Sequence, residues 1–159
     1  MVVNLNISEL VFCIQLASMR YHANVIGKVR ENMKGNRHPY EINLDGVISE
    51  YAFCKHFNIF LDCSTEPRSG GYDALLNGTR FDIKSTRHQN GRLYLHQKIN
   101  RIVDYYVLAI ISEDLLNVDF KGYISYQDAK SETYATVSNG EILYIISPEY
   151  LTKFKEDRE

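Results

Sequence analysis

The spacing of apolar residues near the start of the chain is helical. Within the first thirty residues, one helix would collect Leu10, Val11, Ile14, Leu16, Ala17 and Tyr21. Ser8 is the predicted N-cap of this helix, because a serine hydroxyl can accept a backbone N–H at a helix start. A second helix fits residues 45–57 with Asp45 as its N-cap, and the aperiodic residues 27–40 between the two helices predict a mobile basic loop.

From residue 72 onward the pattern favours strands. Residues 72–76 and 79–85 flank Asn77-Gly78, which predicts a two-residue type I′ turn because such a turn needs positive φ at both positions. Further strands are predicted at residues 103–112 and 117–125, with the apolar run 105–111 at the centre of the sheet. Asn139-Gly140 predicts a second hairpin between strands at residues 133–138 and 141–146. Residues 58–64 fit a short strand, and residues 92–97 fit either a strand or the start of a short helix. Ser147-Pro148 predicts the start of a C-terminal helix with Ser147 as N-cap.

The turn fixes the register of the first hairpin. With Asn77 and Gly78 in the loop, Asp73 is expected opposite Asp82, with Cβ atoms roughly 4.5 to 5.5 Å apart. The apolar face, expected in the core, carries Tyr72, Ala74, Leu76, Phe81 and Ile83, and the other face carries Asp73, Arg80, Asp82 and Lys84, with Leu75 as the exception. Lys84 or a hard cation such as Mg²⁺ would offset the repulsion between the two aspartates. The alternative is a solvent-exposed strand face on which water screens them.

The composition agrees with a single domain over residues 1–159. With 45% hydrophobic and 24% charged residues, the chain can bury a sizeable core, and the order of elements predicts an α/β or α+β sheet flanked by helices. Its longest apolar run is far shorter than a membrane helix, and its first nineteen residues make a poor signal peptide, so we expect a soluble cytoplasmic protein without membrane contact. Cys13, Cys54 and Cys63 have no C-x-x-C spacing, which predicts reduced core thiols.

The net charge of -2 conceals an uneven distribution. Residues 1–103 hold 13 Lys+Arg against 9 Asp+Glu, whereas residues 104–159 hold 5 against 11. The densest basic stretch, residues 80–101, contains Asp82 as its one acid, and a second basic stretch covers residues 20–37. Such patches suit a bound polyanion, although ordinary solvated surfaces would give the same counts.

The hairpin residues resemble a known family. Asp73, followed after eight residues by Asp82-Ile83-Lys84, is similar to the motif of the PD-(D/E)xK nuclease superfamily, in which an acid on one strand faces (D/E)-x-K on its antiparallel neighbour. Tyr72 stands where the family name has proline. Upstream, the segment from Gly46 to Glu50 resembles the helix that supplies a further acid. The same tripeptide pattern recurs at residues 119–121 and 128–130, but only the first copy has an acid placed opposite it by a hairpin.

The resemblance implies an α/β fold with a restriction-endonuclease-like core, a mixed central β-sheet flanked by helices. It also implies a Mg²⁺- or Mn²⁺-dependent deoxyribonuclease, expected to be an endonuclease and, for double-strand cleavage, a homodimer. Asp73, Asp82, the Ile83 carbonyl and Glu50 would hold the metal, and Lys84 would orient or deprotonate the attacking water. The remaining expected residues are Gln97 in the catalytic site and Arg80, Arg87, Arg92, Lys98 and Arg101 along the DNA backbone. The alternative is a non-catalytic protein on this fold that binds nucleic acid or a protein partner.

Overall fold

A mixed five-stranded sheet forms the centre of the computed structural model, which describes residues 1–27, 37–66, 71–97 and 102–155. Its strand order is β1-β6-β5-β3-β2, formed by Val2–Asn4, Asn117–Ser125, Tyr105–Ile111, Thr79–Thr86 and Ala74–Leu76 respectively. β3 and β5 are parallel, and the other neighbours are antiparallel. The predicted α/β class is therefore confirmed, and β5 lies at the centre of the sheet as expected.

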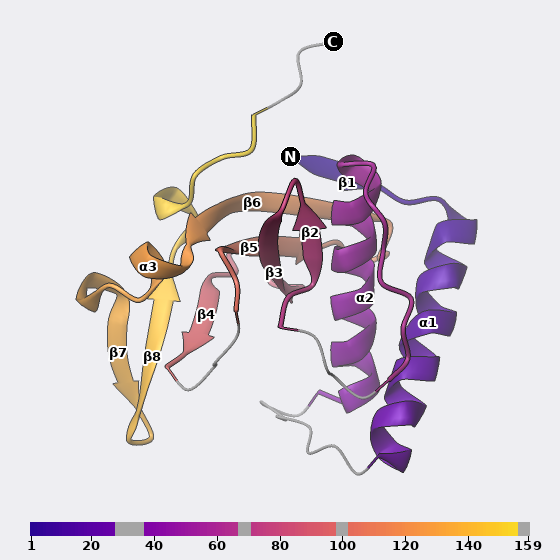
Figure 1. The fold of residues 1–159 in the computed structure, drawn as a ribbon, viewed down its shortest axis with the longest axis horizontal. Helices are drawn as coiled ribbons and strands as arrows, with labels where there is room; N and C mark the ends of the chain where they lie inside the picture. Colours follow the sequence, from indigo (N-terminus) through magenta and orange to yellow (C-terminus); the bar gives the residue numbers. More distant parts are fainter. Residues whose placement is uncertain (28–36, 67–70, 98–101, 156–159) are drawn as a thin grey trace.

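Two helices cover one face of this sheet. α2 (Pro39–His56) packs directly on the strands, and α1 (Ile7–Ile26) packs on the outside of α2 (Figure 1). The core between them contains Cys13, Val47, Ile48, Phe53, Val107 and Phe120. Cys13 and Cys54 are buried as predicted, but Cys63 is exposed. Within the described ranges, no helix combines the length and the apolar character needed to cross a bilayer.

A second, three-stranded sheet covers the other face of β5, where the sequence predicted flanking helices. Its order is β4-β8-β7, formed by Leu93–His96, Glu141–Ile146 and Ala135–Ser138. Leu93 and Leu95 of β4 pack with Tyr106 and Leu108 of β5 in a separate apolar cluster. The short helices α3 (Tyr126–Ala129), η1 (Glu132–Tyr134) and η2 (Pro148–Tyr150) complete this side.

Both predicted Asn-Gly turns are confirmed. Asn77 and Gly78 have φ of 50° and 80°, and the β2–β3 ladder pairs Leu76 with Thr79 and Ala74 with Phe81. The second turn, at Asn139-Gly140, joins β7 to β8 with φ of 52° and 77°. In the first hairpin, Tyr72 is exposed, whereas the sequence predicted it in the core. Residues 58–64, which the structure describes, form no strand, so the short strand predicted there is wrong.

Two helix starts differ from the sequence predictions. Asn6, not Ser8, caps α1, because its Oδ1 accepts the Glu9 N–H (2.9 Å) and Glu9 accepts the Asn6 N–H in return (2.8 Å). α2 begins at Pro39, six residues before the predicted cap Asp45. The loop predicted over residues 27–40 therefore ends before residue 40. Residues 28–36 of that loop lie outside the described chain.

The predicted C-terminal helix is a single 3₁₀ turn. Ser147 precedes Pro148 as expected, but its side chain makes no capping hydrogen bond among the described contacts. Two residues past this turn, Thr152 exchanges two backbone hydrogen bonds with Tyr123, each 2.9 Å long. The chain therefore gains sheet-like pairing with β6, which an extended conformation allows and a helix does not.

Candidate active site

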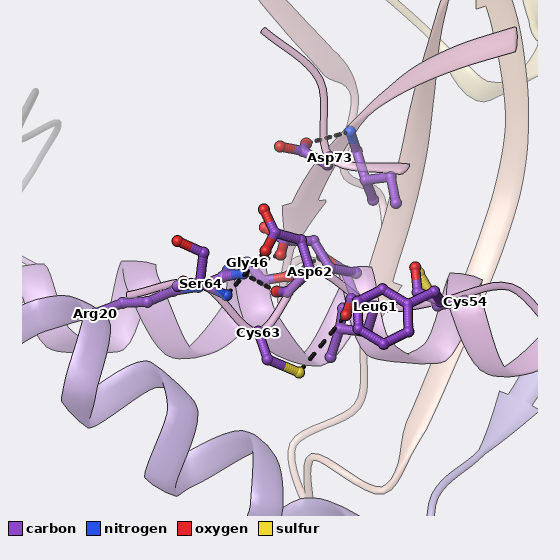
Figure 2. A network of polar contacts seen from close by, with 12 residues as sticks. Arg20, Gly46, Cys54, Leu61, Asp62, Cys63, Ser64 and Asp73 are labelled. Carbon is purple, nitrogen blue, oxygen red and sulfur yellow. Dashed lines mark hydrogen bonds and ion pairs between the residues drawn. The ribbon is translucent and has the colours of Figure 1, made fainter. Parts of the chain in front are cut away.

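Asp73 lies at the point where the β2–β3 ladder ends. Its backbone N–H donates to the Phe81 carbonyl (2.8 Å), so the regular pairing with Asp82 expected from the sequence stops one step earlier, at Ala74. The Asp73 carboxylate instead folds onto β3, where Oδ2 accepts the Ile83 N–H at 2.7 Å (Figure 2). Asp73 therefore reaches Asp82-Ile83 through its side chain instead of through strand pairing.

Asp82 is buried beneath this contact. Its exposed fraction is 0%, and its carboxylate forms an ion pair with the Lys84 ammonium two residues along the same strand. The alternative of an exposed, water-screened strand face is therefore wrong for Asp82. Lys84 is half-buried and is the positive neighbour that the sequence predicted for these acids.

The pKa of Asp73 is raised to about 8. Burial is the largest cause, and the neighbouring Asp82 and Glu50 carboxylates add to it. Lys84 and the hydrogen bond from the Ile83 N–H act in the opposite direction, but they do not cancel the shift. Glu50, predicted from the helix, thus shares an electrostatic environment with the hairpin acids.

Arg20 fixes Glu50 and was missed as a site residue by the sequence reasoning. Its guanidinium donates to the Glu50 carboxylate at 2.7 Å, and also to the carbonyl oxygens of Asp62 (2.5 Å) and Ser64 (3.2 Å) (Figure 2). The Arg20 side chain therefore joins α1 to α2 and to the segment before β2. In the sequence, Arg20 lies one helical turn after Leu16 of the predicted apolar stripe, but that spacing does not identify Glu50 as its partner.

Four of these five residues share one pocket of about 330 Å³, and the fully buried Asp82 is not among the residues that line it. Its walls come from the inner side of α1, from α2, from the segment 62–66 and from β3, and they include Arg20, Glu50, Asp73 and Lys84. Opposite charges therefore line a space large enough for part of a substrate.

The donor atoms are carboxylate and carbonyl oxygens, which hard divalent cations prefer. Within the described ranges, no group of three or more His, Cys, Asp or Glu side chains is arranged to hold a metal ion. Mg²⁺ in proteins is often held by one or two carboxylates, with waters and substrate phosphate completing its shell. The pair Asp73 and Asp82 offers two carboxylates for such a site, although Asp82 is paired with Lys84 just as Glu50 is paired with Arg20.

Two arginines expected on DNA are occupied by ion pairs. Arg80 forms two side-chain hydrogen bonds to Asp104 (3.0 and 2.9 Å), which lower the pKa of Asp104 to about 2. Arg87 donates to the buried Asp45 at 2.6 and 2.9 Å, and Arg37 donates to the other oxygen of Asp45 at 2.7 Å. Asp45 is therefore a structural acid that joins α2 to the end of β3, in place of the N-cap predicted for it.

The other predicted residues lie apart from this cluster. Arg92 is exposed before β4, and Lys98 and Arg101 fall outside the described residues. Gln97 is exposed after β4, where its N–H donates to the Ile142 carbonyl (3.1 Å) in the second sheet. Among the described residues that line the pocket, Gln97 is absent.

Neither a protein-family model, nor a curated protein, nor a solved structure matches the chain.

Proposed function

We propose that the protein is a Mg²⁺- or Mn²⁺-dependent deoxyribonuclease, an endonuclease built on a restriction-endonuclease-like core. One observation carries the proposal: a lysine ammonium contacts a fully buried aspartate on β3, while a second aspartate folds onto the same strand and a glutamate faces the same pocket. Two crowded acids beside a lysine are costly for stability, which favours a role in chemistry over a role in folding.

Asp73 and Asp82, with the Ile83 carbonyl, would hold the metal ion. Bound there, the cation would relieve the carboxylate repulsion and neutralise charge on the scissile phosphate. Glu50, held by Arg20, would accept hydrogen bonds from waters in the pocket instead of completing a three-carboxylate cluster.

Lys84 has the reach and charge to act on the attacking water. Its ammonium is anchored by Asp82 at one side and borders the pocket at the other, so it can donate a hydrogen bond to a phosphate oxygen or orient a water toward phosphorus.

A plasmid-nicking assay tests the proposal. Supercoiled DNA is incubated with wild type in Mg²⁺, Mn²⁺ or EDTA, and we expect nicking with either metal and none with EDTA. Lys84→Ala should reduce the rate at least ~100-fold. Lys121→Ala is the matched control, because Lys121 forms the same i, i+2 ion pair with Asp119 on β6, away from the pocket, and should leave nicking unchanged.

Two outcomes would reject the nuclease assignment. If wild type cuts neither plasmid nor branched or single-stranded DNA, and calorimetry detects no Mn²⁺ binding, a non-catalytic binding protein is the better description. If Lys84→Ala nicks as fast as Lys121→Ala, the chemistry does not take place at this pocket.

A further inference from the structure

The inner side of α1 carries a buried amide that faces the pocket. Asn24 is 8% exposed and belongs to the pocket wall. Among the residues that the structure describes, none exchanges a hydrogen bond with its side chain. Buried polar side chains are nearly always hydrogen-bonded, because an unsatisfied donor or acceptor lowers stability. Asn24 therefore presents an unused donor and an unused acceptor to whatever enters the pocket.

A second amide lies toward the same end of the pocket. Asn24 lies one turn beyond Arg20 on α1. Asn43, which also lines the pocket, lies about two turns before Glu50 on α2. Because the two helices run in opposite directions (Figure 1), both asparagines are displaced toward the same end of the helix pair.

The groups at this end suit a neutral ligand. Asn43 Nδ2 donates to the Pro39 carbonyl (3.1 Å), which leaves its Oδ1 as an acceptor. The nearest cation, Arg20, is already engaged by Glu50 and by two backbone carbonyls. Amides without a free cation beside them favour a planar group that carries both donors and acceptors over a phosphate.

An aromatic ring borders the acidic part of the same pocket. Tyr72 directly precedes Asp73, is 42% exposed and lines the pocket. Within the described ranges, its ring contacts no other aromatic side chain. Exposed tyrosine rings are typical platforms for unpaired bases in proteins that bind single-stranded nucleic acid. A base next to a phosphate held at Asp73 and Lys84 would therefore find a stacking surface at Tyr72.

We propose that the pocket binds one unpaired nucleotide of the DNA, an inference that rests on the proposed function. Its base would stack on Tyr72 and bond to Asn24, while its phosphate would lie at Lys84. The asparagine amide offers a donor and an acceptor side by side, which matches the edge of a nucleobase. The substrate class is therefore DNA with an unpaired nucleotide at the cleavage position, as in a bulge, a branch or a single strand.

A base within a continuous duplex cannot make these contacts. Its two faces are covered by neighbouring bases and its Watson–Crick edge is covered by the opposite strand. Its major-groove edge is open only to groups that protrude into the groove. Asn24 is recessed between α1 and α2, so a base must leave the stack to reach it. This step costs least where the base is already unpaired, which gives the selectivity.

Fluorescence anisotropy with three labelled DNAs of one sequence tests the proposal. One is a perfect duplex, the second carries a single bulged nucleotide, and the third carries the same bulge without its base. Ca²⁺ replaces Mg²⁺, since it also takes oxygen ligands, and a gel verifies that the DNA stays intact. Wild type should bind the bulged duplex about 10-fold or more tightly than the other two. Equal affinities for the three DNAs, or no binding of any, would overturn the proposal.

Variants assign the effect to the pocket. Tyr72→Ala and Asn24→Leu should each raise the Kd for the bulged duplex by about 10-fold, and Tyr72→Phe should keep wild-type affinity because it retains the ring. Tyr94→Ala is the matched control, at a tyrosine 50% exposed on β4 and outside the pocket wall, and should bind normally. Wild-type affinity in both Tyr72→Ala and Asn24→Leu would also overturn the proposal.

The plasmid-nicking assay separates this inference from the nuclease function. A protein that nicks plasmid but binds the three DNAs equally would refute the inference alone. A protein that prefers the bulge through Tyr72 and Asn24 but cuts no DNA would refute the nuclease function alone. Negative supercoiling favours strand opening, so relaxed closed-circular plasmid should be nicked more slowly than the supercoiled form.

Discussion

Replacing Asp73 with asparagine should stabilise the metal-free protein at alkaline pH. Asparagine removes the negative charge that burial, Asp82 and Glu50 disfavour, and its side-chain oxygen can still accept the Ile83 N–H that Asp73 accepts at 2.7 Å. The substitution thus separates the electrostatic cost of the carboxylate from its hydrogen bond.

The direction of this effect on the free energy of unfolding follows from proton binding. The pKa of Asp73 is raised to about 8 in the folded protein, against roughly 3.9 in an unfolded chain. Between these values the folded state holds one proton more than the unfolded state, so the free energy of unfolding falls as pH rises, until Asp73 is ionised in both states. Each pKa unit corresponds to about 1.4 kcal/mol. Because Asp73 borders the pocket, where water screens part of its charge, we expect a gain on the order of 2 kcal/mol at pH 9 and a much smaller gain at pH 5.

Urea unfolding in EDTA at pH 5, 7 and 9 provides the measurement. Asp104→Asn is the matched control with the opposite sign, because Arg80 lowers the pKa of Asp104 to about 2. The stability that Asp104 contributes is present above roughly pH 4 and is lost as pH falls through about 2, so this variant should be less stable by the same amount at all three pH values. A destabilised Asp73→Asn at pH 9, or a gain that does not grow with pH, would contradict a raised pKa of Asp73 in the folded protein.

Three further predictions concern stability and DNA binding. Asn6→Ala should lose about 1 kcal/mol in urea unfolding because it removes the cap of α1, whereas Ser8→Ala should change little, and equal losses would contradict the assigned cap. Asp45→Ala should cost about 3 kcal/mol, because it leaves two arginines without their buried partner, and a loss below about 1 kcal/mol would show that these ion pairs contribute little. Arg92→Ala should lower the number of ions released on DNA binding, measured from its salt dependence, by about one, because Arg92 is exposed. Arg80→Ala should not change this number, because Arg80 is paired with Asp104. The reverse result would show that Arg80 leaves Asp104 to bind phosphate.

Local turn chemistry made the hairpins predictable from the sequence. Asn77-Gly78 supplies the two positive φ values of its turn, so the pairing of Ala74 with Phe81 followed without any knowledge of the rest of the chain. The ends of β6 were predicted to the residue for a related reason, because alternate residues along it are buried.

Long-range partners account for what the sequence did not disclose. Asp45 is of a residue type that often caps helices, but it lies within α2 and accepts a hydrogen bond from Arg87, 42 positions away. In the sequence, Arg20 is only part of a basic stretch, because its partner Glu50 lies 30 positions away and is brought beside it by the fold. The predicted pairing of Asp73 with Asp82 is missing from the ladder, and the Asp73 carboxylate accepts the Ile83 N–H instead. Each of these contacts is set by tertiary packing, which local spacing does not encode.

The connection from β3 to β5 ties the two sheets into one mechanical unit. Parallel neighbours need a crossover, and here the crossover contains β4, whose backbone pairs with β8 and whose side chains pack on the far side of β5. Loosening the small sheet would leave β4 without its neighbour and would uncover β5, the strand beside the one that carries Lys84. Heating should therefore melt both sheets in a single cooperative transition, with the pocket lost at the same temperature as the β7–β8 hairpin.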